Sequence, residues 1–377
     1  MCDSICEDIM NFNIQETDIS IDEINKIYSE RDKERKEIIL NLLKNVSFSK
    51  KYYKNGKIHE EGSFVNGNLH SINGSFCKRY YENEQIREEG TFKNGNLHSI
   101  NGSLCKRYHQ NGKVFDEGTY YNGTLHSING LVCKRYYDNE ITESEGHFKN
   151  DLLSSIGGSI CKKYYKNGKI RFEGTFKNDK VHSVNGSICK GFFDNENKAI
   201  EGTFKDGEPH SINGSICKMY YEKGGLSFEG TLKNGKINSI NSSICKKYYT
   251  NKKINEEGTF KDGNLHSING TICKTYYLNG ELESEGIFNN GKLHSIDGTI
   301  NKSYYENGKL EAEGTHYYSK LHSFNGSICK SYYKNGKPEL EGTFDMGELH
   351  SINGSICKFY YENGKIDLEG TFKNGKF

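Results

Sequence analysis

Residues 103–130 read SLCKRYHQNGKVFDEGTYYNGTLHSING, and this stretch decides the fold because it is one copy of a repeating unit. The dipeptide Glu-Gly, here Glu117-Gly118, returns every 28 residues from Gly62 to Gly370 without insertion or deletion. Residues 47–377 therefore hold eleven full units and a partial twelfth. Such a period indicates one array whose units pack against their neighbours, although 377 residues would otherwise suggest two or three domains.

Each unit contains two turn signals, which in this copy are Asn111-Gly112 and Asn122-Gly123. Asn-Gly favours a two-residue type I′ hairpin turn, because both central residues of that turn need a positive φ. A two-residue loop at Asn111-Gly112 makes residues face each other when their numbers sum to 223. The ladder residues expected from this register are Lys106 facing Glu117, Cys105 facing Gly118, and Lys218 facing Glu229 beside Gly230.

Alternation along these strands predicts one apolar face and one polar face. The apolar face should carry Cys105, His109, Val114 and Tyr120, and the polar face Leu104, Lys106, Tyr108, Glu117 and Thr119. On the apolar face, Gly118 should leave room for a neighbouring ring. The ten recurrent cysteines, one per repeat, are expected to be small buried thiols beside this glycine. Repeats ~9.6 Å apart are too distant for disulfides between them.

The fold expected is all-β, an extended, twisted antiparallel meander of twelve 28-residue hairpin repeats. A β-solenoid with one coil per repeat is the rival architecture. It would stack twelve lysines in one column and twelve glutamates in another at ~4.8 Å. In the meander, opposite charges alternate, so electrostatics and the Asn-Gly turns both favour it.

The first 46 residues differ in composition, with 11 acidic and 6 basic side chains. Residues 1–17 are expected to be poorly ordered. Ser20-Ile-Asp-Glu23 is a capping box that predicts a short α-helical segment within 18–46. This amphipathic helix should cap the first hairpin, and the alternative is that it binds a partner or dimerises.

The sequence contains no constellation that predicts catalysis, a cofactor or a metal site. The recurrent histidine, His126 in this copy, is replaced by Ser154 and Asn238, and a hydrogen bond to a turn is its expected role. Residues 47–377 carry 45 basic and 39 acidic residues, too small an excess for nucleic-acid binding. The sequence has no polybasic cluster of the kind that binds membrane surfaces. It has no run of 18 apolar residues, so no transmembrane helix is predicted. No small-molecule substrate is expected.

The motif Glu-Gly-Thr-Phe-Lys-Asn-Gly-Asn-Leu-His, followed by Tyr-Tyr-x-Asn-Gly-Lys, resembles the MORN repeat. It is most similar to the variant in YwqK-like bacterial proteins and in protist and giant-virus proteins, although their unit is nearer 23 residues. The resemblance covers residues 47–377. It implies elongated twisted antiparallel sheets that serve as scaffolds, dimerisation surfaces or membrane-associated modules.

The function expected is that of a non-enzymatic scaffold that presents an aromatic-rich sheet to a protein partner or to itself. Alternatives are a MORN-type module on anionic lipid and a YwqK-like antitoxin that binds a toxin. Abundant cysteines predict a reducing, cytoplasmic location. The candidate interaction surface is a tyrosine column comprising Tyr80, Tyr108, Tyr136, Tyr164, Tyr220, Tyr248 and Tyr276.

Overall fold

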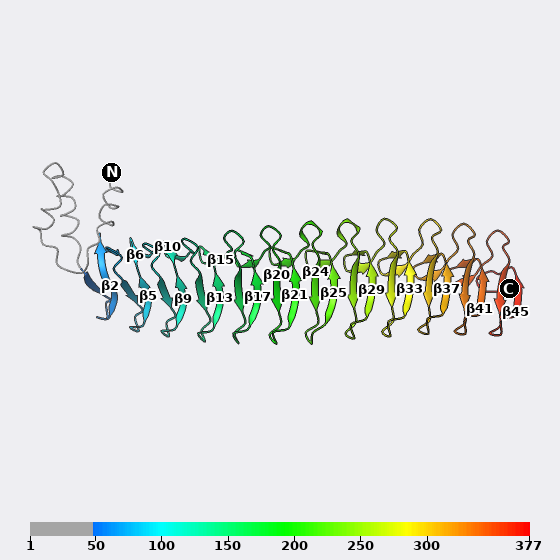
Figure 1. Ribbon diagram of the computed structural model, residues 1–377, viewed down its shortest axis with the longest axis horizontal. Helices are drawn as coiled ribbons and strands as arrows, with labels where there is room; N and C mark the ends of the chain where they lie inside the picture. The colour runs from blue at the N-terminus through cyan, green and yellow to red at the C-terminus, as the bar shows by residue number, and fades with distance from the viewer. Residues whose placement is uncertain (1–47) are drawn as a thin grey trace, which may run out of the picture. The chain divides into compact units, whose positions relative to one another are not determined.

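The computed structural model describes Phe48–Phe377, and these residues form 45 β-strands and no α-helix. They fall into two units, one ending at Lys180 and the other comprising Val181–Phe377. In each unit, successive hairpins lie side by side in an antiparallel meander (Figure 1). The predicted fold class is therefore confirmed, whereas the predictions for residues 1–17 and 18–46 lie outside the described part of the chain.

Two main strands in each repeat build the sheet. In the first unit they are β1 (Phe48–Tyr52), β2 (Ile58–Val65), β4 (Cys77–Tyr80), β5 (Ile86–Gly90), β8 (Cys105–Tyr108), β9 (Val114–Gly118), β12 (Cys133–Tyr136), β13 (Thr142–Gly146), β16 (Cys161–Tyr164) and β17 (Ile170–Gly174). In the second they are β20 (Cys189–Phe192), β21 (Lys198–Gly202), β24 (Cys217–Tyr220), β25 (Leu226–Gly230), β28 (Cys245–Tyr248), β29 (Ile254–Gly258), β32 (Cys273–Tyr276), β33 (Leu282–Gly286), β36 (Asn301–Tyr304), β37 (Leu310–Gly314), β40 (Cys329–Tyr332), β41 (Pro338–Gly342), β44 (Cys357–Tyr360) and β45 (Ile366–Gly370).

The register within a hairpin is the expected one. In β8 and β9, Lys106 faces Glu117 and Cys105 faces Gly118. Glu117 also faces Lys134 of β12, so each second strand pairs with the first strand of the next hairpin. Because both pairings are antiparallel, the solenoid alternative is wrong.

The hairpin turn itself differs from the prediction. Of the pair Asn111-Gly112, only Gly112 has a positive φ (83°), so the turn is not type I′. The N–H of Gly112 donates to the carbonyl of His109 at 2.9 Å. The register shifts beside Tyr108, which faces Val114. This three-residue loop and a bulge together occupy the same length as the expected two-residue loop. The bulge also moves Val114 to the face of Tyr108, opposite to the prediction.

A two-stranded ribbon follows each hairpin and covers one face of the sheet. Tyr120 faces Leu125 across a true type I′ turn, in which Asn122 and Gly123 have φ of 48° and 85°. The ribbons within each unit are β2–β3 (β3 being Asn68–Leu69), β6–β7 (Phe92–Lys93, Asn96–Leu97), β10–β11 (Tyr120–Tyr121, Thr124–Leu125), β14–β15 (Phe148–Lys149, Leu152–Leu153), β22–β23 (Phe204–Lys205, Glu208–Pro209), β26–β27 (Leu232–Lys233, Lys236–Ile237), β30–β31 (Phe260–Lys261, Asn264–Leu265), β34–β35 (Phe288–Asn289, Lys292–Leu293), β38–β39 (His316–Tyr317, Lys320–Leu321) and β42–β43 (Phe344–Asp345, Glu348–Leu349).

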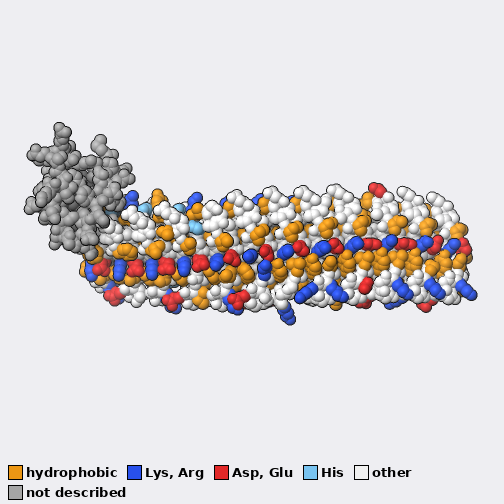
Figure 2. Space-filling model, in the orientation of Figure 1, with side chains coloured by type: hydrophobic (Ala, Val, Ile, Leu, Met, Phe, Trp, Pro, Cys, Tyr) orange, Lys and Arg blue, Asp and Glu red, His pale blue; other side chains and the backbone are white. Residues whose placement is uncertain are grey.

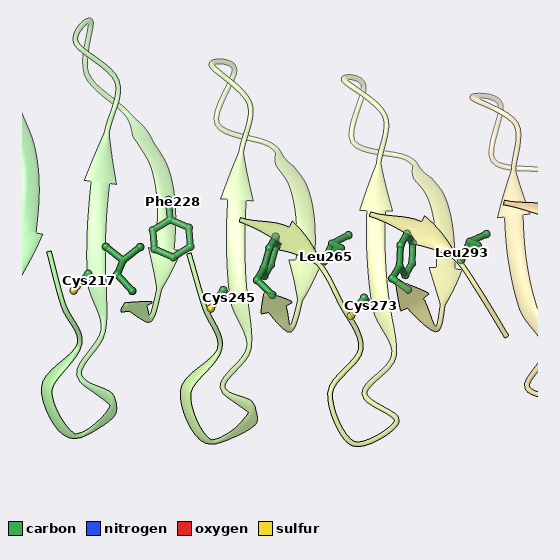
Figure 3. Packing of buried hydrophobic residues seen from close by; sticks show 9 residues of the cluster. Cys217, Phe228, Cys245, Leu265, Cys273 and Leu293 are labelled. Carbon is green, nitrogen blue, oxygen red and sulfur yellow. The ribbon is translucent and has the colours of Figure 1, made fainter. Parts of the chain in front are cut away.

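The core lies between the ribbons and the covered face of the sheet. Cys245, Phe260 and Leu265 are almost completely buried there, and Figure 3 shows the cysteine and leucine columns recurring from repeat to repeat. All ten cysteines between Phe48 and Phe377 are buried free thiols. The core is a thin, repeated layer, which explains how a chain with so few aliphatic residues folds.

Gly118 meets a thiol and not the expected ring. A Cβ at Gly118 would lie 2.6 Å from Cβ of Cys133 in the next repeat. The prediction of Thr119 on the polar face is also wrong, since Thr119 is fully buried and its hydroxyl donates to the carbonyl of His126 at 2.6 Å. The strand alternation ends at Gly118, whose φ is +151°, and the chain turns there into the ribbon.

Candidate interaction surface

The face of the sheet away from the ribbons, here called the open face, carries a row of alternating charge. Lys106 Nζ lies 3.5 Å from Glu117 of its own hairpin, and Glu117 also faces Lys134 of the next. The second unit repeats this arrangement, with Lys218 3.3 Å from Glu229. Figure 2 shows the resulting blue and red row. The hydrogen bond to Glu229 raises the pKa of Lys218.

These ion pairs are partly exposed, with about a third of the Lys106 and Glu117 side chains or more open to solvent. Pairs of this kind typically contribute about 0.2–1 kcal/mol. A one-residue slip of one strand against its neighbour would move its lysine to the opposite face, away from the glutamate. The row therefore fixes the register of the strands more than it adds stability.

The predicted tyrosine column lies beside the charge row on the same face. Each of Tyr80, Tyr108, Tyr136, Tyr164, Tyr220, Tyr248 and Tyr276 is half-buried and donates its hydroxyl to a glutamate of the preceding hairpin. The bond from Tyr108 to Glu89 measures 2.6 Å. Burial, followed by the glutamate, raises the pKa of Tyr80 to about 12. These hydroxyls link repeats, so only the rings are available to a partner.

A second tyrosine column, which the sequence analysis did not single out, forms another link between repeats. The hydroxyl of Tyr81 donates to the backbone carbonyl of Tyr108 at 2.8 Å, and Tyr249 does the same to Tyr276 at 2.7 Å. The recurrent Tyr-Tyr dipeptide was the available signal. His109 interrupts this column, and its buried Nε2 has no hydrogen-bond partner.

An apolar row completes the open face, at the position just before the recurrent cysteine or, in two repeats, before Ser49 and Asn301. Its members are Phe48, Phe76, Leu104, Val132 and Ile160 in the first unit, and Ile188, Ile216, Ile244, Ile272, Ile300, Ile328 and Ile356 in the second. They are 45–66% exposed. Leu104 was predicted on the polar face, which is this open face, but the row was not predicted as a site. Contiguous exposed apolar surface of this kind marks interaction sites.

The histidine column makes the structural contact that was expected. Nδ1 of His98 accepts the backbone N–H of Asn122 at 3.3 Å, and burial lowers the pKa of His98. Where serine replaces histidine, Ser154 Oγ accepts the N–H of Asn178 at 3.0 Å in the same way. Within Phe48–Phe377, no group of three or more His, Cys, Asp or Glu side chains could hold a metal ion.

The covered face of the first unit contains a buried charged network. Asp116 is fully buried, and its carboxylate accepts from the Arg107 guanidinium at 2.5 Å and from the Tyr120 hydroxyl. Arg135 of the next repeat lies 3.6 Å from the same carboxylate. In the second unit the position equivalent to Asp116 holds apolar residues such as Phe228 in five repeats, and Glu256 and Ser284 in the other two.

Comparison with known proteins supports the architecture. A family model described as "MORN repeat variant" matches eight stretches, namely residues 49–66, 77–94, 159–178, 243–262, 271–295, 300–317, 327–346 and 355–374. No curated protein matches the chain. Within Phe48–Phe377, no helix is long and apolar enough to cross a membrane.

Solved structures give only distant similarity. The crystal structure of TcdB2-TccC3 is 13% identical, with 86% of this chain and 17% of that chain covered and a TM-score of 0.14. The Photorhabdus luminescens Tc holotoxin pore is 10% identical, with 86% and 16% covered and the same TM-score. The chain thus spans less than a fifth of these chains. The eight family matches, spread over both units, show that the chain belongs to the MORN-repeat family.

Proposed function

We propose that this chain is a non-enzymatic scaffold that binds a protein partner through the open face of its sheet. The apolar row is the observation that carries the proposal. Twelve of twelve repeats hold a large apolar residue there, about half exposed, and no described side chain covers it. Strand pairing does not require this, because a partly exposed position tolerates polar β-formers such as threonine.

The three rows of the open face suit a protein partner. Apolar side chains and tyrosine rings supply contact area, and the flanking charge row supplies a polar rim of both signs. A net charge near zero gives no general attraction to polyanions. Ten buried free thiols support placing the protein in a reducing compartment such as the cytoplasm.

The proposal is tested by affinity purification from the native source with matched variants. Ile216→Thr with Ile244→Thr removes two apolar residues that are each 45% exposed. Leu152→Thr with Leu278→Thr removes two exposed apolar residues outside the row. The first variant should lose the captured protein and the second should keep it. Equal capture by both variants would refute the open face as the binding surface.

The alternatives require other measurements. Co-sedimentation with anionic vesicles at low salt tests a membrane role, and growth rescue against candidate toxins tests an antitoxin role. In both assays the same pair of variants distinguishes binding through the open face from binding elsewhere.

A further inference from the structure

The ribbon turns of the second unit contain two exceptions to an otherwise constant rule. Every described ribbon turn places a residue with positive φ first, and that residue is Asn or Asp in all repeats except two. The exceptions are Tyr318 (φ 47°) and Met346 (φ 51°), which occupy the turns of consecutive repeats. Large side chains are sterically disfavoured in this region of φ. An observed outlier of this kind is grounds for a functional hypothesis.

The exceptions coincide with a cluster of aromatic rings, which we call the aromatic patch and define as His294, Tyr317, Tyr318 and His322. The Tyr317 and Tyr318 ring centroids lie 4.8 Å apart at 82°, and His294 lies 4.9 Å from Tyr318 at 62°. Tyr317 is 37% exposed and Tyr318 is 45% exposed. The Tyr318 ring thus meets Tyr317 and His294 edge to face, whereas His294 and His322 are tilted by 46° and 47° to Tyr317.

A carboxylate lies beside these rings. Oδ1 of Asp345 is 3.2 Å from Nδ1 of His322, and about half of the Asp345 side chain is exposed. Lys292 and Lys320, on the same ribbons, are exposed as well, so the patch has no net negative charge. A polybasic partner is therefore disfavoured. A single planar cation that stacks on a ring and pairs with one carboxylate is favoured.

Elsewhere in the chain, on the covered face of the sheet, a guanidinium lies beside both a ring and a carboxylate. In the first unit, the guanidinium of Arg107 lies 5.2 Å from the ring centroid of Tyr120 and pairs with Asp116. The second unit has rings and a carboxylate at its aromatic patch, yet residues 181–377 contain no arginine. No arginine of the second unit can therefore fill this patch.

We propose that the aromatic patch binds an arginine side chain of a protein partner, stacked on Tyr317 or Tyr318 and paired with Asp345. This inference deepens the proposed scaffold function by naming the chemistry of one partner group. It uses residues outside the open face, so the two proposals can fail separately.

The test is an NMR titration of the full chain, labelled at tyrosine and histidine rings, with the capped tripeptide Gly-Arg-Gly. The peptide should shift the ring signals of His294, Tyr317, Tyr318 and His322. Capped Gly-Lys-Gly should bind at least about threefold more weakly, because ammonium groups stack poorly on rings. Absence of shifts, or equal binding of the lysine peptide, would overturn the proposal.

A variant separates binding from folding. Tyr317→Lys, Tyr318→Asn and Ser319→Gly together restore residues that other ribbon turns use. In this variant the His294 and His322 signals should no longer shift, while its melting temperature stays equal or rises, since the strained turn is relieved. Tyr121→Lys is the control, because that exposed tyrosine precedes an ordinary Asn-Gly turn in the first unit. Shifts that persist in the triple variant, or vanish in the control, would refute the assignment.

Discussion

Substitution of Gly118 by alanine should locally open the array. The added Cβ would lie 2.6 Å from Cβ and 3.0 Å from Cα of Cys133, and real Cβ atoms do not approach this closely. The φ of +151° adds backbone strain of about 1–3 kcal/mol, and the overlap adds about 1–3 kcal/mol. The expected loss is therefore about 4 kcal/mol, located at the interface of β9 and β12.

Hydrogen exchange is the suitable assay, because opening free energies are read residue by residue in a repeat array. Gly130→Ala is the matched control, since nothing lies within 4 Å of its added Cβ and its φ of +74° costs only about 1–2 kcal/mol. Gly118→Ala combined with Cys133→Gly should recover part of the loss. Equal effects of the two alanine substitutions, or no recovery in the double variant, would refute the packing argument.

Four further predictions address the other contacts. Asp116→Asn should destabilise the first unit by about 1–3 kcal/mol in denaturant unfolding, because two partly exposed arginines lose a fully buried carboxylate and keep only that of Asp151. His98→Ser should flatten the pH dependence of stability below pH 6.5. The folded state holds that imidazole neutral with a lowered pKa, so its contribution is present above pH 6.5 and lost as the pH falls. Tyr81→Phe should cost about 0.5–1.5 kcal/mol, the typical net contribution of a hydrogen bond between repeats. Glu229→Lys should reduce hydrogen-exchange protection around β24 more than Lys223→Glu in the adjacent turn does, and equal effects would count against the ladder.

The register could be predicted from the sequence although one turn was predicted wrongly. Lys106 and Glu117 still face each other because the loop is one residue longer than predicted and the bulge beside Tyr108 takes up that extra residue. Sequence distance alone cannot distinguish a two-residue loop from a three-residue loop with a bulge. The φ of Asn111 depends on the hydrogen bonds of the folded turn, so the dipeptide Asn-Gly does not determine it. At Asn122-Gly123 the same dipeptide forms the turn that was expected.

Contacts between repeats were less accessible to sequence reasoning. The contact between Gly118 and Cys133 joins residues of neighbouring repeats, whereas the register within one repeat gives only the partner inside the hairpin. The third turn, at Asn129-Gly130, was likewise missed. Both residues have positive φ there, and Leu131 donates its N–H to Ile128 at 3.1 Å. Only Asn111-Gly112 and Asn122-Gly123 were predicted as turns, so this second type I′ turn of the repeat was not predicted.

The constancy of one exposed position is the strongest argument for a binding role. A core usually restricts residue type more than a surface does, because packing punishes changes of volume and polarity. Here the covered position of Asp116 accepts glutamate, serine, phenylalanine, isoleucine, alanine and leucine in other repeats. The exposed position of Leu104 stays apolar in all twelve. Folding alone accounts for tolerance at this one covered position, while the covered glycine and cysteine beside it stay nearly constant. It does not account for constancy at a position open to water, whereas contact with a partner does.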